Sequence, residues 1–146
     1  MTVVERSVLI EHSAARMRAL VEDIESYPKF LPWCGAAEIV SRSPDATVAT
    51  LTIDFHGIRQ QFTTANSRGD GEALHIRLVS GPFRALDGEW RFQPLNEHSS
   101  KVTLRLAYEF SSRLLEKAVG PVFRQIASSL VEAFVKRADA VRSARE

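Results

Sequence analysis

The final third of the chain has the apolar spacing of one long helix, and this feature limits the possible folds most. Between Ser112 and Arg145 apolar residues recur in steps of three and four, which places them on one helical face. They are Leu115, Val119, Val122, Phe123, Ile126, Leu130, Phe134, Ala138 and Val141. Gly120-Pro121 interrupts the pattern, so we expect either a kink or a short helix followed by a long one from Pro121. The part after Pro121 would be roughly 37 Å long, enough to cross a small sheet.

Upstream of this helix, from about Ala36 to Phe110, apolar and polar residues mostly alternate, as they do in half-buried strands. Ser13 is the expected N-cap of a short amphipathic helix from Ala14 to about Glu25. The expected strands cover residues 2–11, 36–43, 47–55, 58–66, 74–78, 83–92 (with a bulge or bend at 87–88) and 101–110. The sequence therefore predicts an α+β fold: one domain over residues 1–146, with a curved antiparallel sheet of about six or seven strands wrapped around the C-terminal helix. Such an arrangement can enclose a binding cavity between the sheet and the helix.

A stiff apolar segment, Tyr27–Gly35, joins the short helix to the next strand. It holds Pro28 and Pro32 together with three aromatic residues, and we expect the prolines to end the helix and to prevent regular structure. Its large side chains would either plug the core or form a lid over a cavity. The two interpretations are compatible if the core is hollow.

Composition limits the class of protein and its compartment. Apolar residues make up 45% of the chain and charged residues 25%, which is ordinary for a soluble globular protein. No apolar run reaches the roughly 18 residues that cross a bilayer, and the N-terminus lacks a secretory signal pattern. The single cysteine, Cys34, cannot form an internal disulfide, which fits a reducing compartment. We therefore expect a cytoplasmic protein.

The C-terminal helix is the basic part of the chain, because residues 113–146 hold 7 basic residues against 4 acidic ones. One interpretation is a solvated helix face whose cations lie near the C-terminus, where the helix dipole favours them. The alternative is a weak contact with RNA or lipid headgroups. The candidates for such a contact are Arg124, Lys136, Arg137 and Arg142.

No catalytic constellation is visible in the sequence. The four histidines, His12, His56, His75 and His98, are dispersed without ligand-like spacing, so we expect no metal site. His56 and His75 lie on the faces opposite the apolar rows and are expected at the surface. Cys34 sits among apolar neighbours without a base beside it, which favours a buried, inert thiol. The chain also lacks a phosphate-binding glycine loop and a serine elbow.

Three stretches give the chain a resemblance to a known family. They are Tyr27-Pro28-Lys29-Phe30-Leu31-Pro32-Trp33-Cys34, Gly81-Pro82-Phe83 running into Leu86-Asp87-Gly88-Glu89-Trp90-Arg91-Phe92, and the helical segments 123–127 and 133–138. With these stretches and the order of elements, the chain resembles the START-like (helix-grip) superfamily of polyketide cyclases and lipid carriers. Within it, the chain resembles the coenzyme-Q-binding family, whose bacterial members are named ribosome association toxins.

The resemblance implies two activities without ranking them. One is a non-enzymatic carrier or chaperone that holds ubiquinone or a similar prenyl lipid in an apolar tunnel, for respiration or quinone synthesis, with transient contact at the inner membrane. The alternative is a toxin that binds the large ribosomal subunit, blocks subunit joining and has a small antitoxin partner. A polyketide cyclase or aromatase is a further alternative, and it would need an acid or base inside the cavity. No DNA partner and no covalent cofactor are expected.

The large apolar residues of the expected inner faces are the predicted cavity lining. A quinone head has two acceptor oxygens, for which Gln60, Thr64 or Tyr108 could provide donors, as could Trp33 or Trp90 through the indole N–H. The same three polar residues are the candidates for a cyclase. The predicted apolar lining is Phe30, Leu31, Trp33, Leu51, Ile53, Phe55, Phe62, Leu78, Phe83, Trp90, Phe92, Leu106, Tyr108, Val122, Phe123, Ile126 and Leu130.

Overall fold

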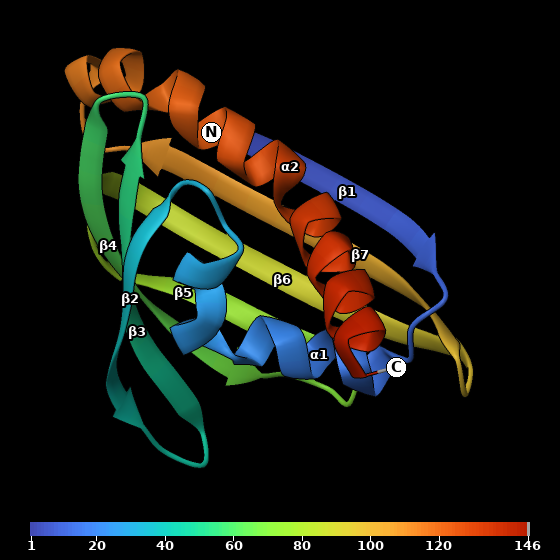
Figure 1. Cartoon of the computed structure of the whole chain (residues 1–146). Coiled ribbons are helices and arrows are strands. Elements are labelled where there is room, and N and C mark those ends of the chain that lie inside the picture. Colours follow the sequence, from blue (N-terminus) through green and yellow to red (C-terminus); the bar gives the residue numbers. More distant parts are fainter. Residues whose placement is uncertain (146) are drawn as a thin grey trace.

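A computed structural model of the protein, which describes residues 1–145, contains one curved antiparallel sheet with a long helix across it (Figure 1). The seven strands are ordered β1-β7-β6-β5-β4-β3-β2, so β1 and β2 are the edges. In chain order the elements are β1 (Thr2–Ile10), α1 (Ala14–Glu22), the 3₁₀ helix η1 (Ile24–Lys29), β2 (Cys34–Arg42), β3 (Ala46–Phe55), β4 (Ile58–Arg68), β5 (Ala73–Ser80), β6 (Phe83–Asn96), β7 (Ser99–Phe110) and α2 (Arg113–Arg145). The predicted fold class is confirmed.

Serine side chains cap the N-termini of α1 and α2. The Ser13 side chain accepts a hydrogen bond from the Arg16 backbone nitrogen at 3.1 Å, which confirms the predicted N-cap of α1. In the same way, Ser112 accepts a bond from the backbone nitrogen of Leu115 at 3.2 Å at the start of α2. The buried His12, directly before Ser13, contacts Asp139 of α2 with 2.6 Å between Nε2 and Oδ1. These contacts fix the C-terminal part of α2 to the turn between β1 and α1.

Some predicted details are wrong. The α-helix α1 ends at Glu22, and η1 continues through Pro28, so the expected irregular segment is limited to residues 30–33. A short 3₁₀ helix can hold this proline because Pro28 is the second residue of the turn that the Phe30 N–H closes onto the Tyr27 oxygen at 3.2 Å, a position that proline favours. Of the two arrangements expected at Gly120-Pro121, the two separate helices are wrong: α2 is one helix that contains Pro121, and its ribbon changes direction along its length, as the kinked alternative implies (Figure 1).

The predicted bulge at Asp87-Gly88 is absent from the described sheet. These residues keep an unbroken register with Ala107 and Leu106 of β7, and β6 runs on to Asn96. Gly88 serves packing instead, because a Cβ atom there would lie 2.8 Å from Cδ1 of Leu106. Glycine in this strand therefore marks a close approach of side chains and not a break.

Two groups of buried apolar residues form the core between the sheet and the helices. The first is aromatic and surrounds Phe123 of α2, whose ring lies 4.9 Å from that of Phe83 and 4.7 Å from that of Tyr108. The second surrounds Phe134 of α2 and includes Trp90, with 5.4 Å between the ring centres. None of the described helices has an apolar stretch long enough to span a bilayer.

Candidate functional site

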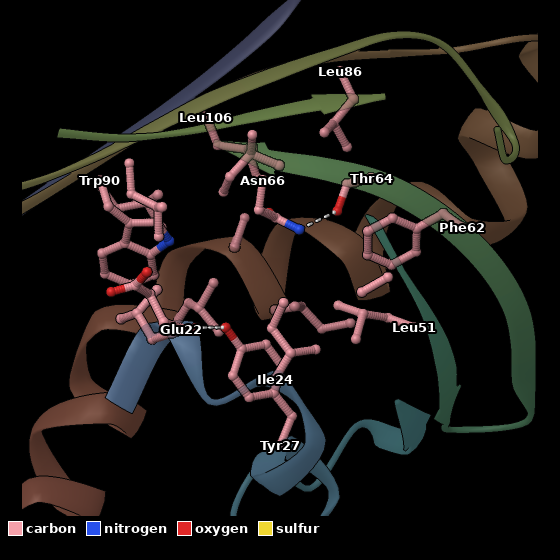
Figure 2. A pocket seen from close by; sticks show the side chains of 18 of the residues that line it. Glu22, Ile24, Tyr27, Leu51, Phe62, Thr64, Asn66, Leu86, Trp90 and Leu106 are labelled. Atoms are coloured by element: carbon pink, nitrogen blue, oxygen red, sulfur yellow. Dashed lines mark hydrogen bonds between the residues drawn. The ribbon is translucent and has the colours of Figure 1, made fainter. Parts of the chain in front are cut away.

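A cavity of about 310 Å³ lies where the two core groups meet, between the concave face of the sheet and α2 (Figure 2). Its walls are mostly apolar, with a few polar side chains at one side. The lining residues are Val21, Glu22, Ile24, Tyr27, Trp33, Arg42, Thr47, Ala49, Leu51, Phe62, Thr64, Asn66, Leu74, Ile76, Leu86, Trp90, Leu104, Leu106, Phe123, Ile126, Ala127, Leu130 and Phe134. The volume is at the low end of the roughly 300–1,000 Å³ typical of small-molecule sites.

The proline-stiffened segment closes part of this cavity. Tyr27 and Trp33 line it, while Leu31 between them is fully buried in the core. The Tyr27 hydroxyl donates a hydrogen bond to the backbone oxygen of Val21, and burial raises the pKa of this phenol far above its ordinary value. Tyr27 is therefore a neutral wall residue. The plug and lid interpretations both apply, because one part of the segment fills the core and another borders a hollow.

Polar side chains of β3 and β4 form one side of the cavity. The Asn66 side-chain nitrogen donates to the backbone oxygen of Thr47 and to Oγ1 of Thr64, each at 3.3 Å (Figure 2). Thr64 is buried, so its hydroxyl is one of the few polar groups that a molecule inside the cavity could reach. Alternation from Phe62 through Thr64 to Asn66 brings all three to the same face.

Two ion pairs mark the rim. Glu22 and Arg42 line the cavity and also reach solvent, with side chains 31% and 54% exposed. Glu22 accepts hydrogen bonds from Arg68 at 3.1–3.2 Å, and Arg42 donates to Glu25 at 3.0 Å. Each pair joins the α1–η1 segment to a strand of the sheet. The pairs are too exposed to contribute more than about 1 kcal/mol each to stability. Because they lie at the rim, we expect them to hold the α1–η1 segment at the entrance of the cavity.

We expect Arg68→Ala to leave the free energy of unfolding within about 1 kcal/mol of the wild-type value. The same change should speed the release of a neutral apolar fluorophore, N-phenyl-1-naphthylamine, several-fold, because the α1–η1 segment loses its tie to β4. Stopped-flow fluorescence measures this rate. A matched swap, Glu22→Arg with Arg68→Glu, should restore the slow release. Unchanged release in Arg68→Ala would show that the pair does not control the opening.

The structure brings together about half of the predicted cavity residues. Trp33, Leu51, Phe62, Trp90, Leu106, Phe123, Ile126 and Leu130 line the cavity, as does the polar Thr64. The others do not line it, and each is buried or half-buried in the packing around it. This second set is Phe30, Leu31, Ile53, Phe55, Gln60, Leu78, Phe83, Phe92, Tyr108 and Val122.

Packing explains the residues outside the cavity. Phe83, Tyr108 and Phe110 pack against Phe123 and against one another, and none of the three reaches the cavity. Phe30 packs on Phe134 at 5.3 Å between ring centres. The fully buried Ile53 is on the correct face of β3, but it lies where the face is filled.

Sequence analysis missed most of the polar rim. Asn66 and Thr47 continue the alternating rows of Phe62 and Leu51, so extending those rows by one step could have found them. Glu22 and Arg42 look like ordinary surface residues in the sequence. Only the position of the α1–η1 segment over β2 and β4 brings them to the cavity.

Cys34 is buried, as predicted. Its Sγ contacts the backbone oxygen of Ala36 at 3.4 Å, and burial raises its pKa from 9.0 to about 11. A group whose folded-state pKa is raised contributes stability below its unfolded pKa and loses that contribution as pH rises through the folded value. For Cys34 this window runs from pH 9 to about 11.

We expect iodoacetamide to modify Cys34 in the folded protein about 100-fold more slowly at pH 8 than in the urea-unfolded protein. The reason is that a pKa higher by about two units lowers the thiolate fraction by that factor. Mass spectrometry over time gives both rates. Cys34 is the only cysteine of the chain, so any alkylation reports on this thiol. Equal rates in the two states would show that the thiol is exposed.

The predicted anion-contact residues have different surroundings. Arg124 and Lys136 are exposed and, within the described part of the chain, in no salt bridge. The Arg137 guanidinium instead lies 5.1 Å from the centre of the Phe30 ring. Arg142 donates to the Glu11 backbone oxygen at 2.9 Å and lies 3.7 Å from the Asp139 carboxylate. Of the histidines expected at the surface, His56 is exposed and His75 is partly exposed.

Comparison with known proteins agrees with this architecture. Residues 10–135 match the model of the family described as polyketide cyclase / dehydrase and lipid transport. This chain belongs to that family. Two solved structures have the same fold at low sequence identity. A START superfamily protein from Mycobacterium smegmatis aligns with a TM-score of 0.77 at 21% identity, covering 95% of this chain and 98% of that one. The Zhui aromatase/cyclase from Streptomyces aligns with a TM-score of 0.83 at 16% identity, covering 94% and 93%.

Relatives of higher sequence identity than these structures carry the name ribosome association toxin. The ribosome association toxin RatA of Escherichia coli K12 is 38% identical over 145 residues, which are 99% of this chain and 92% of that protein. RatA of Vibrio cholerae is 42% identical over 141 residues, or 97% and 98% of the two chains. A more distant relative is the mitochondrial coenzyme Q-binding protein COQ10 homolog B of Xenopus laevis. It is 26% identical over 144 residues, which are 96% of this chain and 59% of that protein.

Proposed function

We propose that this protein associates with ribosomes and inhibits translation. The observation that supports this best is the identity of 38–42% with proteins named ribosome association toxins over nearly the whole of both chains. The aligned regions include the surface residues as well as the core. A surface function can therefore be shared, whereas fold similarity alone would leave it open.

The exposed face of α2 gives this proposal a physical basis. Arg113, Lys117 and Arg124 are all exposed and follow each other at steps of four and seven, which aligns them along one stripe of the helix. None of the three is in a salt bridge among the described residues. A stripe of unpaired cations can contact the phosphates of ribosomal RNA. Lys136 lies further round the helix.

Expression of the protein followed by sucrose-gradient profiling tests the proposal. We expect the peak of joined ribosomes to shrink and free subunits to accumulate. The double variant Lys117→Glu with Arg124→Glu should abolish the effect, because it reverses two charges of the stripe. The control is Arg77→Glu with Lys101→Glu, which changes net charge equally at two exposed positions on β5 and β7. A wild-type profile identical to that of empty vector would contradict the proposal, as would equal loss in both double variants.

The cavity supports a second proposed function, the binding of a ligand without catalysis. We infer that the cavity binds a hydrophobic molecule of the lipid class. The distant coenzyme Q-binding relative suggests ubiquinone as the candidate. Apolar walls stabilise such a ligand by about 0.8 kcal/mol per buried methylene. Its volume suits a ring system or a short chain. A long isoprenoid tail would extend through the opening between Glu22 and Arg42. Native mass spectrometry and organic extraction of the purified protein test this, and repeated failure to find or load any lipid would contradict it.

A further inference from the structure

The cavity contains a hydrogen-bond donor that the protein leaves free. Trp90 of β6 is only 2% exposed, yet among the described residues nothing accepts a hydrogen bond from its indole Nε1. Figure 2 shows this nitrogen turned toward the inside of the cavity that Trp90 lines. This N–H has no acceptor among the described protein atoms, so a molecule in the cavity that offers an oxygen to it would gain a hydrogen bond.

A second polar point lies on β4. The Thr47 backbone oxygen can only accept, so the Asn66 amide must point its nitrogen there, and the same nitrogen donates to Thr64. Two groups then stay available to a ligand: the Asn66 side-chain oxygen as an acceptor and the Thr64 hydroxyl hydrogen as a donor. Both residues line the cavity.

The two polar points lie apart across the sheet. Trp90 is on β6 and Asn66 on β4, with β5 between them, and Leu74 and Ile76 of β5 separate them with apolar surface. Strands are about 4.8 Å apart, so two strand spacings are roughly 10 Å. An elongated molecule with an oxygen near each end can reach both points, whereas a compact molecule with one oxygen can reach only one.

The charged residues at the rim of the cavity influence whether a charged ligand can bind. Glu22 and Arg42 are the charged residues that line the cavity, and each already has a partner, Arg68 and Glu25 respectively. An anionic ligand such as a fatty-acid carboxylate would have to break one of these pairs to find a cation. The arrangement therefore disfavours charged lipids.

We infer that the cavity selects neutral, elongated apolar molecules that carry an oxygen near each end. One oxygen accepts a hydrogen bond from Nε1 of Trp90, and the other bonds to Thr64 and Asn66. This inference rests on the second proposed function, because it defines the ligand of that cavity. It does not depend on any activity at the ribosome.

Displacement of N-phenyl-1-naphthylamine by three matched compounds tests the inference: 1-decanol, 1,10-decanediol and decanoate. In a purely apolar cavity the second hydroxyl of the diol would lack a partner, and the diol would bind at least 10-fold more weakly than decanol. We expect the diol to bind as tightly as decanol or more tightly, and decanoate at least 10-fold more weakly than decanol at pH 7.

Trp90→Phe should weaken binding of the diol about 5- to 10-fold and that of decanol less than 2-fold, since decanol can still use the Asn66 side. Trp33→Phe is the matched control, because it removes the other indole N–H of the cavity lining and should leave the diol unaffected. A diol that binds far more weakly than decanol, or a loss in Trp33→Phe instead of Trp90→Phe, would overturn the inference while cavity binding stands. Failure of the fluorophore and of all three compounds to bind would overturn both.

Discussion

Phe134→Ala is expected to lower the free energy of unfolding by about 3–5 kcal/mol, the range for truncation of a buried aromatic residue. Phe134 is 1% exposed, and its ring centre lies 5.4 Å from that of Tyr27, 5.3 Å from that of Phe30 and 5.4 Å from that of Trp90. One side chain thus connects α2 with η1, the segment after it and β6. A domain of this size has roughly 5–15 kcal/mol of stability in total, so this change removes a large share of it.

Urea unfolding followed by circular dichroism measures the loss at Phe134. Leu114→Ala is the control on the same helix, because Leu114 is 78% exposed and its truncation should stay within about 0.5 kcal/mol of the wild type. The packing of Phe134 against three rings, compared with the exposed Leu114, should give a large difference in stability between the two variants. Similar midpoints for both would mean that α2 is not held to η1 and the sheet as described.

Gly81→Ala is expected to cost about 2–4 kcal/mol. The φ angle of Gly81 is 145°, a value that residues with a Cβ atom rarely adopt. A Cβ atom there would also lie 2.7 Å from Cβ and 3.1 Å from Cα of Phe62, a residue of the cavity wall. Neither atom can move without shifting β4, so the backbone strain and the steric clash add together.

The control for Gly81 is Gly71→Ala. Nothing lies within 4 Å of a Cβ atom built at Gly71, and its backbone has no unusual φ. We therefore expect this variant to be neutral or slightly stabilising in thermal unfolding. If both glycine variants had the same midpoint, the tight turn between β5 and β6 would not be constrained in the way that the structure describes.

Much of the fold could be predicted from the sequence because its periods are unambiguous. Val102, Leu104 and Leu106 alternate cleanly in β7 and are buried, and Phe123 and Phe134 lie on the expected face of α2. The errors in the predicted secondary structure lie at residues that are compatible with more than one local structure. Proline at position 28 fits a 3₁₀ helix, and glycine at position 88 permits close packing without breaking a strand.

The cavity could be predicted only in part, for a physical reason. Periodicity shows which side of a strand faces inward, and it correctly indicated Phe62, Thr64 and Trp90. It does not show how far α2 lies from each point of the sheet. Tyr108 and Phe62 are therefore equivalent in pattern, yet Phe62 lines the cavity and Tyr108 packs on Phe123 without reaching it. The rim pairs depend on contacts distant in sequence, which no local pattern contains.

The most direct test of the account is co-sedimentation of the purified protein with purified large ribosomal subunits at increasing salt concentrations. We expect the wild-type protein to pellet with the subunits at low salt and to be released progressively as salt rises, because phosphate contacts release counterions. The Lys117→Glu, Arg124→Glu variant should stay in the supernatant, while the Arg77→Glu, Lys101→Glu control pellets like the wild type. Wild-type protein that stays in the supernatant at every salt concentration would contradict the account.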